Sequence, residues 1–184
     1  MTAMLVGVVG PSGAGKDTLL AGARAALAAE PRIRWVRRVI TRPAEAGGED
    51  HEALDPAAFA ARREAGGFAL WWEAHGLLYG IPRAIEADLR AGRVVVANLS
   101  RGVLAEAAAR YPLLVLEVTV PPALRAARLA RRGREDAADI AARLAREAPL
   151  PPGLRVHTVV NDGTVEAGVA CVAAVLRGLL SPAG

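Results

Sequence analysis

The chain has 184 residues, a length that suits one domain with a substantial hydrophobic core. Its net charge is +4, but its arginines are dispersed and aromatic residues make up only 4%, so we do not expect nucleic-acid binding. No apolar run approaches the roughly 18 residues of a membrane span, and no basic region precedes the first apolar stretch, so we expect a cytoplasmic protein without a signal peptide. Cys171, the single cysteine, cannot form an internal disulfide, and its apolar helical surroundings predict a buried thiol.

Strand and helix patterns alternate along the chain. Residues 4–9 form an apolar run typical of a buried strand, residues 17–29 follow as a helix, and residues 34–40 predict a second strand. Further helices are expected at 56–63, 82–91, 102–110, 122–131, 137–147 and 165–180, and further strands at 68–72, 77–79, 93–97, 113–120 and 155–160. Asp55 and Pro56 favour the start of the first of these helices, as N-cap and first helical residue.

This alternation predicts an α/β fold in three layers, with a mostly parallel sheet covered by helices on both faces. The polar, Gly-rich region from 41 to 81 breaks the pattern. We therefore expect a single domain whose core comprises residues 1–40 and 82–184, with a small lobe inserted at about 41–81.

The segment from Gly10 to Thr18, Gly-Pro-Ser-Gly-Ala-Gly-Lys-Asp-Thr, has the pattern of a P-loop. Lys16 is the only lysine among 23 basic residues. An incidental lysine in a Gly-rich turn is the alternative, but the flanking strand and helix favour a phosphate cradle of backbone N–H groups. The residues expected to hold the phosphates of a nucleotide are Gly10, Ser12, Gly13, Ala14, Gly15, Lys16 and Thr18.

Asp17 stands where a P-loop normally has the Ser or Thr whose hydroxyl binds Mg²⁺. Thr18 cannot simply replace that hydroxyl, because one residue along a helix turns the side chain by about 100°. We infer that Asp17 contacts Mg²⁺, directly or through water, since carboxylate oxygen is a ligand that this ion prefers. Stabilisation of the first helical turn by its negative charge is a second role that Asp17 can have at the same time.

Four motifs together resemble the guanylate kinase family of nucleoside monophosphate kinases, from about residue 4 to 176: the P-loop, Thr41-Arg42, Tyr79-Gly80 and Arg132-Gly133. Within that superfamily the chain is more similar to the ribose 1,5-bisphosphate kinases of phosphonate metabolism. The motifs of this branch are Lys16-Asp17, Ile40-Thr41-Arg42, Gly48-Glu49-Asp50-His51, Asn98-Leu99-Ser100-Arg101, Arg132-Gly133-Arg134-Glu135-Asp136 and Asn161-Asp162-Gly163.

The resemblance implies that ATP and Mg²⁺ are the cofactors and that an arginine-rich lid, at about 131–138, closes over the ATP. Arg132 in this lid and Arg143 on the next helix would clamp the transferring phosphoryl group. Asn161 would pack beside the adenine, although a simple turn is the alternative reading.

The acceptor site that the resemblance implies uses residues of the inserted lobe and of a strand end. Arg42 and Tyr79 would bind a phosphate of the acceptor, and Arg101 is a further candidate for substrate binding. His51 could contact the sugar or a phosphate, or only satisfy its own loop. Glu49 could hold a ribose hydroxyl or a hydrated metal, or be an exposed acid.

Two positions argue against a purine acceptor. Guanylate kinases read guanine with a glutamate in a Phe-x-Glu-Trp segment and with a hydroxyl after Tyr-Gly; here Leu70 and Ile81 stand at those positions. Neither side chain can form a hydrogen bond, and an unpaired guanine edge would cost about 1–3 kcal/mol per buried group. Trp72 and His75 are expected to flank this pocket.

A phosphorylated sugar without a base fits this pattern. The resemblance implies which sugar this is, and the expected reaction is the ATP-dependent phosphorylation of ribose 1,5-bisphosphate to 5-phosphoribosyl 1-diphosphate and ADP. A nucleoside monophosphate kinase with altered base preference, and an inactive guanylate kinase-like binding module, are the alternatives. We expect ATP and a phosphosugar as small-molecule partners, expect no membrane partner, and leave a homodimer open.

Acidic residues end the strand near residue 97 in guanylate kinases, but this chain has Ala97-Asn98-Leu99-Ser100 there. We therefore expect Asp17 to supply the carboxylate near the metal, in place of the acidic residue at this strand end.

Overall fold

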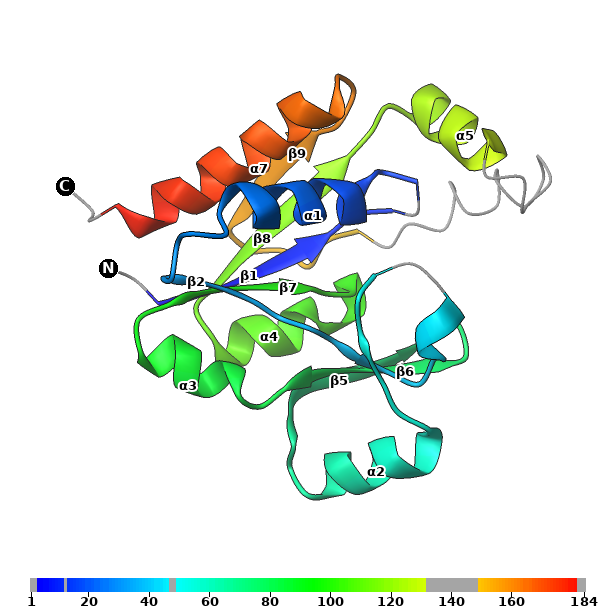
Figure 1. Cartoon of the computed structure of the whole chain (residues 1–184), viewed down its shortest axis with the longest axis vertical. Coiled ribbons are helices and arrows are strands. Elements are labelled where there is room, and N and C mark those ends of the chain that lie inside the picture. Colours follow the sequence, from blue (N-terminus) through cyan, green and yellow to red (C-terminus); the bar gives the residue numbers. More distant parts are fainter. Residues whose placement is uncertain (1–2, 12, 47–48, 132–148, 182–184) are drawn as a thin grey trace.

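The computed structural model describes residues 3–11, 13–46, 49–131 and 149–181, and Figure 1 shows two sheets, one below the other. Every strand pair of the upper sheet is parallel, and its strand order is β2-β7-β1-β8-β9. The strands of this sheet are β1 Met4–Val9, β2 Ile33–Trp35, β7 Val94–Asn98, β8 Leu113–Thr119 and β9 Val156–Val160. This arrangement confirms the predicted α/β fold.

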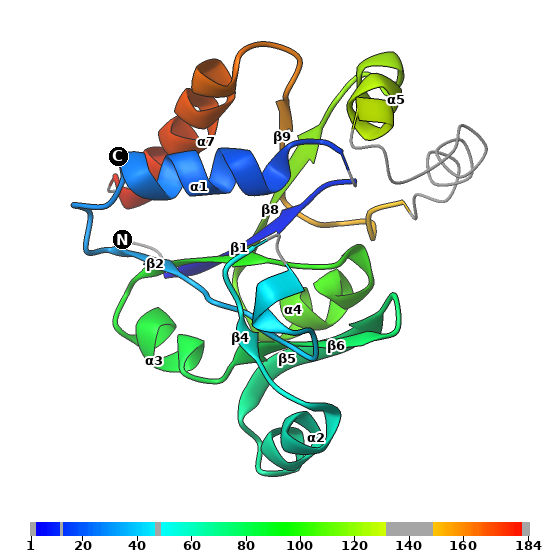
Figure 2. The same ribbon diagram turned by 45° about the vertical axis from the view of Figure 1, so that its right-hand side comes forward.

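Helices α1 (Lys16–Ala26) and α7 (Val165–Leu180) cover the upper face of the parallel sheet, and α3 (Ile85–Arg90) and α4 (Leu104–Arg110) lie below it (Figures 1 and 2). The period-2 alternation of strand side chains serves both faces. In β1, Val6 and Val8 belong to the core under α1 and α7, whereas Leu5 and Val9 belong to the core on the opposite side.

The lower sheet has the order β4-β3-β6-β5, with β3 antiparallel to β6 and β6 antiparallel to β5. Helix α2 (Pro56–Glu64) packs against it through Phe59, whose ring lies 4.5 Å from that of Phe68. Asp55 caps this helix as predicted, since its carboxylate accepts a hydrogen bond from the Ala58 amide at 2.8 Å. The strands are β3 Val39–Ile40, β4 Glu52–Ala53, β5 Phe68–Ala74 and β6 Leu77–Pro82.

The prediction of one strand over 34–40 is wrong, because this stretch passes from one sheet to the other. The Val36 amide still donates to the Val96 carbonyl of the parallel sheet at 2.9 Å. Val39 and Ile40 instead pair with β4 and β6. Residues 36–38 therefore form the crossing between the two layers, and they bring Arg38 to the space between them.

Several helix boundaries also differ from prediction. Helix α3 begins at Ile85 rather than Pro82, because Pro82 still pairs with Phe68 and the next amide, of Arg83, donates to the Gly67 carbonyl. Helix α1 ends at Ala26. The stretch predicted as a helix over 102–110 begins as a 3-10 helix and becomes α-helical at Leu104. Helix α5 (Pro122–Arg131) agrees with prediction, while the helix expected over 137–147 lies outside the described residues.

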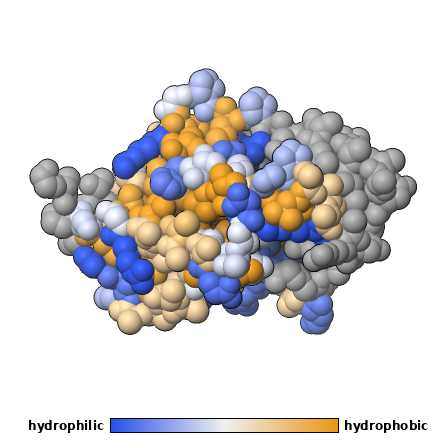
Figure 3. Space-filling model, turned by 90° about the horizontal axis from the view of Figure 1, so that it is seen from above, coloured by the Kyte–Doolittle hydropathy of each residue, from blue (hydrophilic) through white to orange (hydrophobic). Residues whose placement is uncertain are grey.

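The prediction for Cys171 is wrong: its thiol is exposed. Helix α7 is rich in Ala, Val and Leu around its whole circumference, and Figure 3 shows apolar side chains gathered on the outer face of the molecule where α7 lies. The apolar residues around Cys171 therefore did not indicate that its side of the helix is buried. None of the described helices has the length and apolar character needed to cross a bilayer.

Candidate active site

The loop between β1 and α1 has the backbone geometry of a phosphate cradle. Gly13 and Gly15 have φ angles of 83° and 81°, a left-handed conformation that glycine adopts without steric cost. At Gly10, a Cβ atom would lie 2.5 Å from the Val118 carbonyl oxygen, so no larger residue fits. Ala14 is fully buried behind the loop. Ser12 lies outside the described residues.

Helix α1 begins at Lys16, and no described side chain caps its first turn. Its free N–H groups and the positive end of its dipole are therefore open to an anion. Burial lowers the pKa of Lys16; Arg38 lowers it further, while Asp17 and Glu49 raise it. A bound phosphate would favour the charged lysine, which burial alone disfavours.

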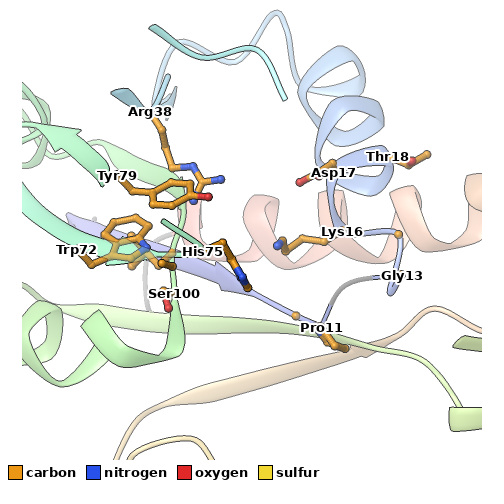
Figure 4. Close-up of a pocket in the computed structure, with 14 residues that line it drawn as sticks. Pro11, Gly13, Lys16, Asp17, Thr18, Arg38, Trp72, His75, Tyr79 and Ser100 are labelled. Carbon is orange, nitrogen blue, oxygen red and sulfur yellow. The ribbon is translucent and has the colours of Figure 1, made fainter. Parts of the chain in front are cut away.

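A cavity of about 280 Å³ lies in front of this loop (Figure 4). One wall consists of the P-loop and the start of α1, including Lys16, Asp17 and Thr18. Leu99 and Ser100 line it from the end of β7. The residues on the opposite wall, which comes from the crossing segment and the β5–β6 hairpin, are Arg38, Trp72, Ala74, His75 and Tyr79.

Aromatic rings form much of that opposite wall. The rings of Trp72 and Tyr79 are stacked, with centroids 5.4 Å apart and planes 5° from parallel. His75 lies at the hairpin turn with a φ of 53°, and its side chain reaches the cavity (Figure 4). The structure therefore brings together Trp72, His75 and Tyr79, three of the residues that the sequence placed around the acceptor site.

A polar network connects the P-loop side of the cavity to the inserted lobe. The Asn98 side-chain amide, at the end of β7, donates to Asp17 at 3.1 Å and to Glu49 at 3.4 Å. Glu49 also accepts a hydrogen bond from Arg38 Nε at 2.8 Å and forms an ion pair with this guanidinium. Glu49 is thus mostly buried and paired, and it is not the exposed acid that the sequence left open.

This network suits Mg²⁺. The Oδ1 atom of Asn98 is buried and has no hydrogen-bond partner among the described residues. The amide nitrogen of Asn98, and not this oxygen, faces Asp17, so the Asp17 carboxylate on the cavity wall is the hard oxygen donor that would hold Mg²⁺. In the described part of the chain, His, Cys, Asp and Glu side chains do not come together in any group of three or more that could hold a metal ion.

Arg42 and His51 form a separate cluster within the inserted lobe. His51 is 3% exposed, and its two ring nitrogens each lie 3.0 Å from a carbonyl oxygen, those of Glu49 and Arg42. The ring therefore stabilises its own loop, which is one of the roles that the sequence left open for His51. It does not line the cavity in front of Lys16. The Nε atom of Arg42 is buried without a partner among the described residues, and Arg42, like His51, does not line the cavity in front of Lys16.

Arg101 and Asn161 do not contact the cavity in front of Lys16. Arg101 donates to Glu117 at 3.0 Å, and both side chains are largely buried. The Asn161 amide donates to the Ala14 carbonyl at 2.8 Å. Asn161 also lines a second cavity, of about 260 Å³, on the α7 side of the P-loop, together with Arg128. Its contact with the loop is a positioning role that the sequence did not predict.

Leu70 and Ile81, at the two expected base-reading positions, lie opposite each other in the β5–β6 pair and are fully buried. They pack in the core between the two sheets. The structure therefore offers no polar side chain at these two positions. Arg132 and Arg143, the expected phosphoryl clamps, lie outside the described residues.

Sequence reasoning missed Arg38 and the amide of Asn98. Arg38 lies in a stretch predicted only as strand, and Asn98 was named as part of a family motif without a contact of its own. A strand pattern does not reveal which polar residue faces a site. The signal for Arg38 was the pair Arg37-Arg38, which interrupts an otherwise apolar run.

A P-loop in front of a helix N-terminus, facing a small lobe across a cavity of about 280 Å³, defines a P-loop kinase fold. Among solved structures, guanylate kinase from Anaplasma phagocytophilum is similar, with a TM-score of 0.68 and 18% identity over 96% of this chain and 85% of that one. At this identity the likeness shows the fold alone. No family model matches the chain.

Curated relatives are much closer in sequence. "Ribose 1,5-bisphosphate phosphokinase PhnN" of a Ruegeria species is 49% identical over 176 residues, which are 94% of this chain and 91% of that protein. A "bifunctional ribose 1,5-bisphosphokinase-thymidine phosphorylase" of Azorhizobium caulinodans is 53% identical over 164 residues, and the chain spans about a quarter of its length. The chain belongs to the ribose 1,5-bisphosphate phosphokinase family.

Proposed function

We propose that this chain transfers the γ-phosphoryl group of ATP to the 1-phosphate of ribose 1,5-bisphosphate, giving 5-phosphoribosyl 1-diphosphate and ADP. The observation that carries the proposal is the pair of walls around the cavity. A complete P-loop faces arginine and tyrosine side chains, while the two base-reading positions are occupied by buried Leu70 and Ile81.

The roles of the donor-side residues follow from this reaction. The attacking group is already an anionic phosphate oxygen, so the site needs no strong general base. Backbone N–H groups at Gly13 and Gly15 and the ammonium of Lys16 would hold the ATP phosphates. Mg²⁺ held near Asp17 and Asn98 would neutralise charge on those phosphates. Catalysis then consists of positioning and charge neutralisation.

On the acceptor side, Arg42 keeps an unpaired donor, and Tyr79 presents its hydroxyl to the cavity (Figure 4). We assign both to acceptor phosphate binding. Glu49 and His51 would shape this side of the site through the loop that they stabilise. Arg132 and Arg143 keep the clamp role that the family resemblance implies. A cytoplasmic location and a homodimer stay predictions.

ADP release with ATP and Mg²⁺ tests the proposal, with ribose 1,5-bisphosphate and GMP as parallel acceptors. We expect turnover on the sugar and none on GMP. Turnover on GMP would support the nucleoside monophosphate kinase, and silence on both would support the binding module.

A further inference from the structure

Arg38 is the one arginine among the described residues that line the cavity in front of Lys16. It comes from the crossing segment between β2 and β3, and its side chain is 13% exposed. Figure 4 shows its guanidinium beside Tyr79, on the wall opposite Lys16. The donor and acceptor roles assigned above leave this cation without a function.

The guanidinium is held in a fixed orientation. It lies 5.0 Å from the centroid of the Tyr79 ring and 5.7 Å from that of Trp72, and these rings are themselves stacked. A flat aromatic surface under an arginine restricts its rotation and excludes water from one side. Interactions with an anion are stronger in such a site than on an open surface.

A carboxylate already occupies the fork of this guanidinium. One oxygen of Glu49, Oε1, accepts from both Nε and Nη2 of Arg38, and its second oxygen lies 3.4 Å from the Asn98 amide. Carboxylate and phosphate oxygens both accept hydrogen bonds from an arginine fork. Glu49 therefore occupies a position that suits a phosphate, and a substrate phosphate can take its place because a dianion attracts the guanidinium more strongly than one carboxylate does.

The acceptor of the proposed reaction carries two phosphates, and this inference rests on that reaction. The reacting 1-phosphate must meet the γ-phosphate of ATP close to Lys16. Arg38 stands on the opposite wall of the same cavity, so a phosphate that it binds is the one farther from the donor. We propose that Arg38 binds the non-reacting 5-phosphate of the acceptor and thereby selects a sugar bisphosphate over substrates with one phosphate.

Competition by two monophosphates separates this role from a structural one. Ribose 5-phosphate carries only the group that Arg38 would bind, and ribose 1-phosphate carries only the reacting group. Inhibition constants for both, against ribose 1,5-bisphosphate, are measured with the wild-type chain, Arg38→Met and Arg38→Lys. Arg37→Met is the matched control, because Arg37 is exposed, pairs with Asp50 at 2.9 Å and does not line the cavity.

In Arg38→Met we expect the inhibition constant of ribose 5-phosphate and the KM of the bisphosphate to rise about 10- to 100-fold, the usual effect of losing a charged hydrogen bond. The constant for ribose 1-phosphate should stay near the wild-type value, which also shows that the variant is folded. Arg38→Lys should lie between the two, and Arg37→Met should match the wild type.

Three results would overturn the role of Arg38 and leave the kinase reaction unaffected. The inhibition constants of both monophosphates could rise equally in Arg38→Met, neither constant could change, or ribose 5-phosphate could fail to inhibit the wild type. A wild-type chain that does not phosphorylate ribose 1,5-bisphosphate at all would instead refute the proposed function, and this inference with it.

Discussion

The two walls of the cavity are built in different ways. The P-loop wall is continuous in sequence, and its chemistry comes from backbone amides fixed by glycines, with Lys16 and Asp17 as its charged side chains. The opposite wall combines Arg38 from a crossing segment with Trp72 and Tyr79 from a hairpin. The P-loop wall suits the phosphates of ATP, which is the donor for all ATP-dependent kinases. The residues of the opposite wall can differ between kinases that have different acceptors.

The largest expected effect is on the P-loop wall. Lys16→Met should lower turnover by about 10²- to 10³-fold, the scale seen when one preorganised charge-stabilising donor is lost. The thermal midpoint should stay close to that of the wild type, since a partly buried charge is replaced by an apolar chain of similar length. Coupled ADP-release assays and thermal melts measure both; near-normal turnover would contradict a P-loop role.

Asp17→Asn tests the junction of the two walls. This change keeps the size of the side chain but removes the charge that we place beside Mg²⁺. We expect turnover to fall about tenfold or more at low Mg²⁺, as expected when a hydrogen-bonded charge is lost, and to recover partly at high Mg²⁺.

The affinity for ATP without metal should change little in this variant. Glu166→Gln, another acidic residue in the first turn of a helix, is the matched control. A dependence of turnover on Mg²⁺ concentration identical to that of the wild type would contradict the assignment of Asp17 as a metal ligand.

A smaller effect is expected behind the P-loop. Asn161→Ala removes the hydrogen bond to the Ala14 carbonyl, which among the described residues then keeps a long side-chain contact from Arg128 at 3.4 Å. A partly unsatisfied carbonyl should raise the KM for ATP about fivefold, or roughly 1 kcal/mol, and leave the KM for the acceptor unchanged. A larger change in the acceptor KM would show that the two walls are not independent.

The smallest effect is expected at the edge of the lobe. Asp55→Ala removes the N-cap of α2 and should cost about 1 kcal/mol in the free energy of unfolding, without changing either KM. Urea denaturation and steady-state kinetics measure these quantities. A changed acceptor KM would mean that α2 takes part in shaping the acceptor wall.

The sequence predicted much of the fold because the parallel strands carry near-continuous apolar runs and the helices between them have clear starts. Strand β1 and helix α7 agree with prediction to the residue. The stretch 34–40 was misread because residues of two different sheets follow one another without a turn signal. Cys171 was misplaced because α7 is apolar on its exposed side as well.

The two walls of the candidate site also differ in how well the sequence predicts them. The P-loop could be read from the sequence, since its chemistry depends on glycine spacing and one lysine. The network of Arg38, Glu49, Asn98 and Asp17 could not, because its members are up to 81 positions apart and meet only through the packing of two sheets. His51 likewise proved to hold a loop through two carbonyls, which no spacing rule reveals.

The most direct test is phosphorus NMR of the product formed from ATP, Mg²⁺ and ribose 1,5-bisphosphate. We expect the signal of the 1-phosphate to be replaced by the coupled pair of a diphosphate, in equal amount to the ADP formed, while the 5-phosphate signal persists. Release of inorganic phosphate with the bisphosphate unchanged would refute the proposed phosphoryl transfer.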